Sequence, residues 1–136
     1  MDEKPLVEKA LGARGNAYAP YSGFRVGACV RTASGRTYTG CNIENAAFGA
    51  SCCAERVALY TALAAGEREF THIAVASDGD AITYPCGTCR QVITEFAPHA
   101  QIICADRAGA FESYEAGALL PHAFAFGPGN EGCGDV

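Results

Sequence analysis

Three cysteines carried by two short segments constrain this chain more than any other feature of its sequence. The segments read Cys-Ala-Glu-Arg at residues 53–56 and Pro-Cys-Gly-Thr-Cys at residues 85–89. Zinc favours thiolate and imidazole ligands in tetrahedral geometry, with about 2.3 Å between zinc and sulfur. The pattern therefore predicts a zinc site formed by Cys53, Cys86 and Cys89, and a fold that brings the two segments together.

The number of ligands indicates a catalytic site. A structural zinc is normally closed by four protein ligands, whereas a catalytic zinc keeps its fourth position for water or substrate. Glu55 lies two residues after Cys53, so on a helix it sits within a turn of the metal without having to bind it. A carboxylate there can take a proton from zinc-bound water and pass it to a substrate. We therefore predict one zinc per chain and Glu55 as the catalytic residue; a structural zinc or three unmetallated core cysteines are the alternatives.

Two neighbours of these residues need a separate interpretation. Cys52 is a candidate fourth ligand, but adjacent residues on a helix point about 100° apart, so we expect Cys52 to pack instead. Arg56 is expected near the thiolates, where a hydrogen bond to a sulfur would offset the negative charge of three thiolates on one divalent ion. The alternative for Arg56 is an exposed helix arginine.

Size and charge limit the classes of function. With 136 residues we expect one domain, residues 1–136, with a flexible tail at residues 127–136. The net charge is −5 and the ten lysines and arginines are scattered, which argues against a nucleic-acid partner and fits a small uncharged substrate. Hydrophobic residues make up 49% of the chain, which favours an oligomer.

The remaining cysteines and the N-terminus indicate a compartment. Five of the eight cysteines lie outside the metal pattern, and Cys29, Cys41 and Cys104 fall in strand-like runs. They are interpreted as small buried hydrophobes in a reducing compartment. Residues 1–9 lack the apolar core of a signal peptide, and no apolar run approaches membrane length. We expect a cytoplasmic protein without a membrane partner.

Hydrophobic periodicity predicts alternating helices and strands. Helices are expected at residues 5–18, 52–65, 86–96 and 115–120, and strands at residues 24–33, 36–41, 71–77, 101–105 and 110–114. Ser34-Gly35 is interpreted as a two-residue hairpin turn. This order predicts an α/β fold with a mixed five-stranded sheet, the two zinc-bearing helices side by side on one face and further helices on the other.

The metal pattern resembles the signature of the zinc deaminases, in which a first ligand, any residue and Glu precede Pro-Cys-x-x-Cys. The chain is similar to the small cytidine deaminases that act on free nucleosides. Further matches lie at residues 19–28, 40–46 and 119–121, so the resemblance runs from about residue 18 to residue 124. It implies a three-layer cytidine-deaminase-like fold, a homotetramer, and hydrolytic deamination of cytidine and deoxycytidine to uridine and deoxyuridine with release of ammonia, in pyrimidine salvage.

The resemblance also implies roles for residues outside the metal pattern. Phe24 becomes a platform on which the base stacks, Asn42 and Glu44 hold the ribose hydroxyls, and Ala54 contacts the substrate. The alternatives are that Phe24 is a core aromatic residue and that the two polar side chains only cap their loop. Phe48 and Phe124 are candidates for contacts across subunits. Phe48 stands where relatives can have tyrosine.

Three other functions remain open from the residues alone. One is deamination of another cytosine compound, such as a nucleoside antibiotic or a nucleotide, although a nucleotide needs a phosphate pocket and the sequence has no basic cluster. Another is a non-catalytic, zinc-stabilised interaction module. The last is editing of single-stranded nucleic acid, which the net charge opposes.

Overall fold

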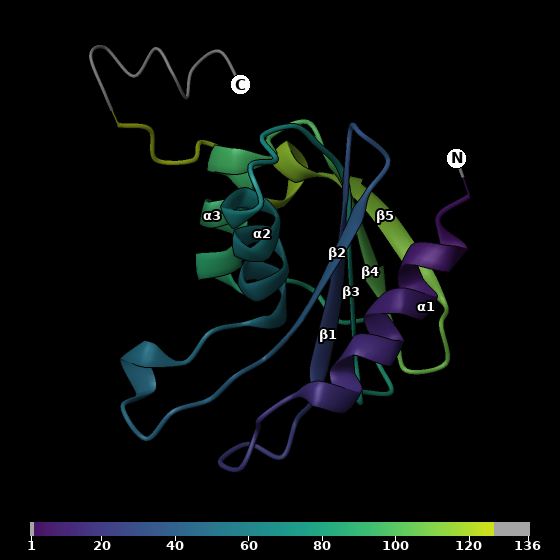
Figure 1. Ribbon diagram of the computed structural model, residues 1–136, viewed down its shortest axis with the longest axis vertical. Coiled ribbons are helices and arrows are strands. Elements are labelled where there is room, and N and C mark those ends of the chain that lie inside the picture. The colour runs from purple at the N-terminus through teal and green to yellow at the C-terminus, as the bar shows by residue number, and fades with distance from the viewer. Residues whose placement is uncertain (1, 127–136) are drawn as a thin grey trace.

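The fold is organised around a mixed sheet of five strands, seen in Figure 1 of the computed structural model, which describes residues 2–126. In chain order the strands are β1 (Val26–Thr32), β2 (Thr37–Cys41), β3 (Phe70–Ser77), β4 (Gln101–Ala105) and β5 (Phe111–Glu115). Across the sheet they run β2-β1-β3-β4-β5. Strand β1 is antiparallel to both neighbours, β3 and β4 are parallel, and β5 is antiparallel to β4. The predicted mixed five-stranded sheet is confirmed.

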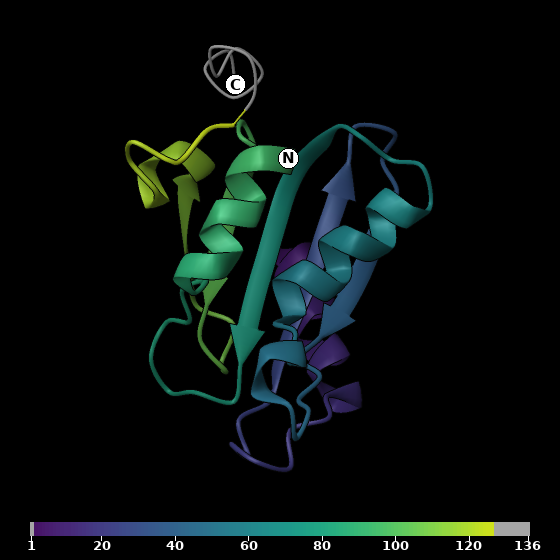
Figure 2. The same ribbon diagram turned by 90° about the vertical axis from the view of Figure 1, so that its left-hand side faces the viewer.

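Helices cover both faces of the sheet. They are α1 (Lys4–Ala13), α2 (Ala54–Ala64) and α3 (Gly87–Phe96), with short 3₁₀ helices η1 (Arg14–Asn16), η2 (Phe48–Ala50) and η3 (Ala116–Leu119). Helices α2 and α3 lie side by side on one face (Figure 2), and α1 lies on the other (Figure 1). The three-layer α/β arrangement is therefore confirmed.

The helices on the second face differ from the prediction. Within residues 2–126, α1 is the one α-helix there, although further helices are predicted from the sequence. The helix predicted at residues 115–120 is the 3₁₀ helix η3, which contacts α3 and β5 instead. The helix predicted at residues 5–18 ends as an α-helix at Ala13 and continues as η1 to Asn16.

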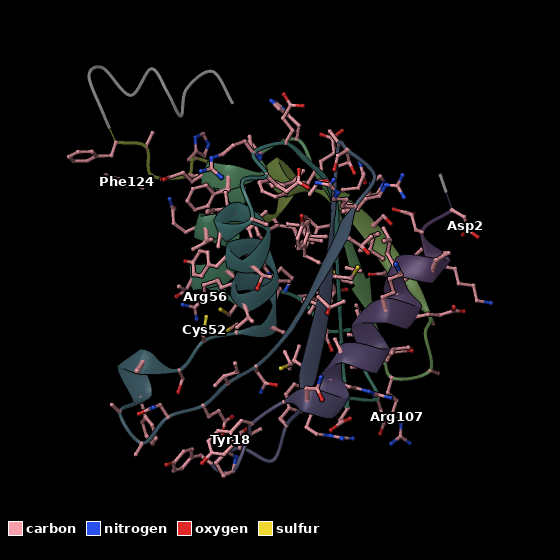
Figure 3. All side chains as sticks on the ribbon, viewed as in Figure 1. Asp2, Tyr18, Cys52, Arg56, Arg107 and Phe124 are labelled. Carbon is pink, nitrogen blue, oxygen red and sulfur yellow. The ribbon has the colours of Figure 1, made fainter. Side chains whose placement is uncertain are left out.

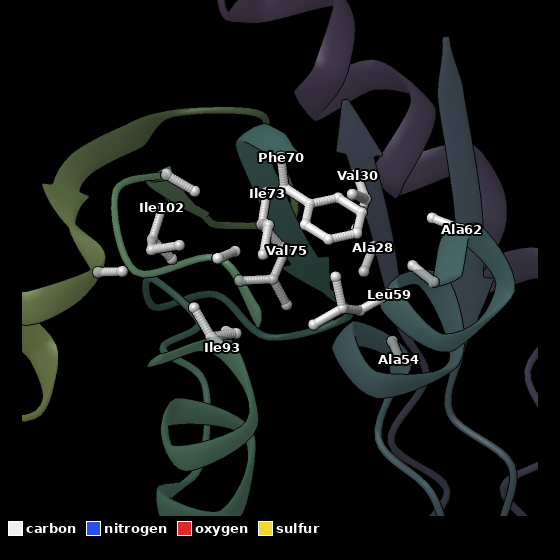
Figure 4. Close-up of a cluster of buried hydrophobic side chains, with 14 of the residues drawn as sticks. Ala28, Val30, Ala54, Leu59, Ala62, Phe70, Ile73, Val75, Ile93 and Ile102 are labelled. Atoms are coloured by element: carbon white, nitrogen blue, oxygen red, sulfur yellow. The ribbon is translucent and has the colours of Figure 1, made fainter. Parts of the chain in front are cut away.

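The apolar character of β3 follows from its burial between two helical layers. Side chains alternate along a strand, so Ile73 and Val75 point to the layer of α2 and α3, whereas Ala74 and Ala76 point to α1. Figure 4 shows the first set packed with Leu59 of α2. Larger side chains fill the layer that carries the metal segments, and alanines let α1 approach closely.

A close approach between α2 and β2 fixes the start of the first metal helix. A Cβ atom on Gly40 would lie 2.7 Å from the carbonyl oxygen of Ala54 and closer still to the amide nitrogen of Ala58. Real Cβ atoms do not tolerate such contacts, so the backbone of α2 rests directly on β2 at this glycine. Gly40 therefore sets the height of the first turn of α2 above the sheet.

Both hairpin turns have the same construction. The amide of Thr32 donates to the carbonyl of Arg36, and the amide of Gly35 donates back to the carbonyl of Thr32, which leaves a three-residue loop. Gly35 has φ 90°, and residues 106–110 repeat the arrangement with Gly109 at φ 92°. The two-residue turn predicted from the sequence is wrong by one residue, because a glycine in the left-handed region accommodates the extra position.

Two predictions concern the extent of the domain and of the tail. The flexible tail at residues 127–136 lies outside the described residues, and the single-domain boundaries stay a prediction. Among residues 2–126, no helix has both the length and the apolar character needed to cross a bilayer.

Candidate active site and zinc centre

The first cysteine of each metal segment stands at the N-cap of a helix. Cys53 precedes α2 with ψ 155°, and Cys86 precedes α3 with ψ 170°. An N-cap residue has this extended backbone, so the helices predicted from Cys52 and Cys86 begin later, at Ala54 and Gly87. Thiolates at helix N-termini are stabilised by the backbone amides and by the helix dipole. Both segments therefore present sulfur where negative charge is favoured.

Three sulfur atoms meet between these helix ends. The Sγ atoms of Cys53, Cys86 and Cys89 all lie within 4.8 Å of one another, and those of Cys53 and Cys86 are 3.7 Å apart. Tetrahedral bonds of about 2.3 Å would separate two ligating sulfurs by roughly 3.8 Å. Cys52 is not part of this group; its backbone pairs with Ile43 in an isolated antiparallel bridge. The spacing of the three sulfurs fits a zinc ion with an open fourth position.

The surroundings of the sulfurs favour negative charge on Cys53. Arg56 donates from Nη2 to the sulfur of Cys53 at 3.4 Å, while its Nε is buried and has no hydrogen-bond partner within residues 2–126. The amide of Cys89 donates to the sulfur of Cys86 at 3.4 Å. The neighbouring Cys89 thiol and the Arg56 guanidinium stabilise the Cys53 thiolate, which lowers the pKa of Cys53 to about 5. Figure 3 shows Arg56 and Cys52 at the start of α2.

Glu55 is buried in the first turn of α2, with only 5% of its surface exposed. Burial disfavours the ionised carboxylate and raises the pKa of Glu55 to about 7. A carboxyl group with this pKa can both accept and donate a proton near neutrality. It lines the same pocket as Cys53 and Cys86.

A pocket of about 270 Å³ opens in front of these groups. Its lining comes from the loop before β1, the first residue of β1, the loop after β2, the start of α2 and the loop before α3: Ser22, Phe24, Val26, Asn42, Glu44, Cys53, Ala54, Glu55, Thr83, Tyr84 and Cys86. The four residues proposed to contact substrate, Phe24, Asn42, Glu44 and Ala54, all lie in this wall. The pocket therefore joins the sulfur cluster to the loops that carry the other motifs.

Four residues of the pocket wall are absent from the residues singled out in the sequence. Ser22 and Val26 lie inside the motif at residues 19–28, and Thr83 and Tyr84 directly precede the proline of the second metal segment. Tyr84 is also fixed from the sheet edge, because its hydroxyl donates to Glu112 at 2.8 Å. Their positions next to motifs are the only sequence signal that could have indicated them.

The carboxylate of Glu44 holds the loop before β1. Its Oε1 accepts from the amides of Tyr21 at 2.9 Å and Ser22 at 3.1 Å, and its Oε2 accepts from the Ser22 hydroxyl at 2.5 Å. The hydrogen bond from Ser22 keeps the pKa of Glu44 below its ordinary value. The carboxylate thus stays charged at the pocket wall and retains free acceptor positions on its oxygens.

Asn42 holds the two peptide groups that flank Arg25, directly before β1. Its Oδ1 accepts from the amide of Val26 at 2.9 Å, and its Nδ2 donates to the carbonyl of Phe24 at 2.8 Å. The ring of Phe24 packs against Gly79, since a Cβ atom added to Gly79 would lie 3.4 Å from the ring. The loop-capping use of Asn42 is therefore present in the structure alongside its position in the pocket.

The two phenylalanines proposed for contacts across subunits lie outside the pocket. Phe48 is 75% exposed and meets Tyr21 edge-on, with ring centroids 5.9 Å apart. It borders a shallow hollow beside the pocket that Ser22 and Glu44 also line. Phe124 is 69% exposed and lies far from Tyr18 and the pocket loops in Figure 3. Their contacts across subunits stay predictions.

Comparison with known proteins gives one consistent family. Residues 1–105 match the family described as the cytidine and deoxycytidylate deaminase zinc-binding region. Curated cytidine deaminases from Halalkalibacterium halodurans and Sporosarcina psychrophila are 41% and 42% identical over 125 residues. These alignments cover 91% of this chain in both cases, and 95% and 92% of the relatives.

Solved structures agree with the sequence relatives. The cytidine deaminase from Burkholderia pseudomallei superposes with a TM-score of 0.88 and 46% identity, over 91% of this chain and all of that chain (100%). The cytidine deaminase from Mycobacterium tuberculosis gives a TM-score of 0.81 with 33% identity, over 93% of this chain and 99% of its own.

Proposed function

We propose, since the chain belongs to the cytidine and deoxycytidylate deaminase family, that it catalyses the hydrolytic deamination of cytidine and deoxycytidine in pyrimidine salvage. The products are uridine or deoxyuridine and ammonia. The observation that carries this proposal is the position of Glu55, buried in the same pocket as the sulfur cluster, with Cys53 and Cys86 in the pocket wall. An interaction module stabilised by zinc would have no use for a buried carboxyl group beside an open metal position.

Cys53, Cys86 and Cys89 hold one zinc ion, in keeping with the zinc-binding region of the family and the spacing of the sulfurs. Zinc in this position acts as a Lewis acid that lowers the pKa of a water toward neutrality. Glu55 takes a proton from the attacking water and delivers it to the ring nitrogen beside the amine-bearing carbon. The water oxygen bonds to that carbon, Glu55 passes the second proton to the amine, and the amine leaves as ammonia. One water is consumed for each ammonia released.

The walls of the pocket suit an uncharged nucleoside. We assign Phe24 to stacking against the base, and Asn42 and Glu44 to the ribose hydroxyls, because a neutral sugar is recognised through directional hydrogen bonds. Ala54, which lines the same pocket, is assigned as a further contact to the substrate. The described lining contains no lysine or arginine, and the carboxylate of Glu44 would repel a phosphate. A nucleoside is therefore preferred to a nucleotide.

The Glu55→Gln variant tests the assignment of the proton carrier. Because the amide keeps the shape and cannot carry the proton, turnover of cytidine should fall by about a hundredfold or more. Zinc content should stay at one per chain, since Glu55 is not a ligand. The matched control is Glu95→Gln on the exposed side of α3, which should keep the turnover of the parent. Rapid turnover by Glu55→Gln would rule out this mechanism.

We further propose a homotetramer in which neighbouring subunits complete each pocket, and a cytoplasmic location. The support for association is a set of exposed apolar side chains around the pocket and on the segment after η3: Tyr18, Tyr21, Ile43, Phe48 and Phe124. The cysteines within residues 2–126 are all free, and three of them form the zinc site. Free thiols and a thiolate zinc site suit a reducing compartment.

A further inference from the structure

We propose that Ser22 is a positioning residue that holds the sugar-binding carboxylate and the base-binding ring in one arrangement. The inference rests on the proposed function of the pocket, and it concerns the hydroxyl group of Ser22. That oxygen donates to Oε2 of Glu44 at 2.5 Å and accepts from the amide of Phe24 at 3.0 Å. A single hydroxyl thus joins the two residues that we assign to opposite ends of the nucleoside.

The hydroxyl group has one proton, and the geometry determines where it points. Since the amide of Phe24 can only donate, Ser22 must accept there, and its own proton is left for Glu44. The turn that carries Ser22 is fixed by Gly23, which has φ 68° and donates its amide to the carbonyl of Ala19 at 2.9 Å. The serine side chain is therefore held toward the pocket, which it lines.

The orientation of Glu44 depends on this hydrogen bond. Its Oε1 is already engaged by the amides of Tyr21 and Ser22, so the Ser22 hydroxyl is what fixes Oε2. With both oxygens held, the plane of the carboxylate is set, and its free acceptor positions are presented to the sugar. A carboxylate held only at Oε1 could rotate about its bond to the side chain.

The same hydroxyl completes the support of Phe24. Asn42 donates to the carbonyl of Phe24 at 2.8 Å, and Ser22 accepts from its amide, so the peptide groups on both sides of the ring are held. Loss of the hydroxyl would remove the hydrogen bond that holds the amide of Phe24. The consequence should appear in substrate binding, because the hydrogen bonds of the Ser22 hydroxyl within residues 2–126 are to Glu44 and Phe24 and do not involve Glu55 or the sulfurs.

The test compares Ser22→Ala with the parent on cytidine and on 2′,3′-dideoxycytidine, which lacks both ring hydroxyls. Removal of a hydrogen bond to a charged group should raise KM for cytidine by roughly tenfold to a hundredfold, with kcat changed by less than about threefold. The KM for dideoxycytidine should rise much less, because this substrate has no ring hydroxyls to bind the oriented carboxylate. Ser22→Thr keeps the hydroxyl and should return KM to within a few-fold of the parent.

The matched control is Ser113→Ala on β5. The Ser113 hydroxyl also donates to a carboxylate, that of Glu3 at 3.0 Å, but it lies outside the pocket. Its loss should leave both kinetic constants unchanged. The Glu44→Gln variant combined with Ser22→Ala should show less than the sum of the two separate effects, because both act through the same carboxylate.

Two results would overturn the role of Ser22: an unchanged KM in Ser22→Ala, or equal losses of kcat/KM on cytidine and dideoxycytidine. The second would mean a general loosening of the loop. Failure of the proposed function looks different, because the parent itself would then leave cytidine unconverted while holding its zinc.

Discussion

Arg56 lies in the first turn of α2 beside the cysteine sulfurs, and its positive charge balances the negative charge of the thiolates. It donates to the sulfur of Cys53 at 3.4 Å, and this hydrogen bond holds the pKa of Arg56 above its ordinary value. Three thiolates on a divalent ion carry a net negative charge, which a neighbouring guanidinium offsets. Partners of this kind commonly account for about tenfold to a hundredfold in metal affinity or activity.

We therefore expect Arg56→Ala to lose zinc to a competing chelator about ten to a hundred times more readily than the parent. The matched control is Arg68→Ala in the segment between α2 and β3, where the side chain donates to the carbonyls of Leu63 and Glu67. That variant should keep the zinc affinity of the parent. Equal zinc retention by Arg56→Ala and Arg68→Ala would contradict the role given to Arg56.

At the scale of elements, the contact between β2 and α2 controls the position of the catalytic carboxyl. Since a Cβ on Gly40 would overlap the backbone of Ala54 and Ala58, Gly40→Ala must push the first turn of α2 off the sheet. Overpacking of this kind costs about 1–3 kcal/mol of stability. We expect a lower unfolding midpoint in urea and a lower kcat, because Glu55 moves with the helix.

The control for this prediction is Gly12→Ala in α1. Nothing lies within 4 Å of a Cβ at that position, and alanine is a better helix former than glycine. The unfolding free energy should rise by about 0.5–1 kcal/mol, with kcat unchanged. A Gly40→Ala protein as stable and as active as the parent would show that the helix does not rest on the strand in this way.

A cluster of charges joins η1 to the residue before β1 and the residue after β3. Asp78 accepts from Arg25 Nε at 2.9 Å and lies 3.3 Å from Nη1 of Arg14. The hydrogen bond from Arg25 lowers the pKa of Asp78 below 3.8. A carboxyl whose pKa is lower in the folded chain adds stability above its unfolded pKa, and this stability is lost as the pH falls through the folded value.

Asp78→Asn should therefore lower the unfolding free energy at pH 7, and the difference from the parent should shrink as the pH falls below 3.8. Asp80→Asn is the control, because its pair with Arg107 is highly exposed, with side-chain exposures of 85% and 63%. It should change little at either pH. A pH-independent difference for Asp78→Asn would remove the electrostatic explanation.

At the scale of the whole molecule, the exposed aromatic side chains predict association. Phe48 and Tyr21 form an exposed edge-on pair beside the pocket, and side chains of this size are costly to leave in water. The proposed homotetramer predicts that light scattering gives a mass of four chains at micromolar concentration. A fully active monomer would contradict both the tetramer and the completion of the site by neighbours.

The layers of the fold could be predicted from the sequence, whereas several boundaries could not. Central strands such as β3 are apolar because both of their faces are covered, and this leaves a clear pattern. Helix starts are less readable, because Cys53 and Cys86 have extended backbones although helical residues follow them. The loop of the hairpin at Gly35 is one residue longer than predicted, because Gly35 adopts a left-handed backbone that the hydrophobic pattern does not indicate.

In the candidate site, too, some features could be predicted from the sequence and others could not. The sulfur cluster follows from ligand type and spacing, since Cys86 and Cys89 share one helical turn. The roles of Ser22 and Tyr84 are harder to predict than those of the cysteines, because they depend on partners distant in the sequence, Glu44 and Glu112. Such pairs exist only once the fold has brought two loops or strands together.

The most direct test of cytidine deamination by this protein is the ultraviolet spectrum of cytidine incubated with purified protein that holds one zinc per chain. Deamination replaces the amine on the ring by oxygen, so the spectrum of cytidine should change into that of uridine, and ammonia should appear in equal amount. An unchanged spectrum, with one zinc per chain confirmed, would contradict the assignment of Glu55 and the sulfur cluster to cytidine deamination.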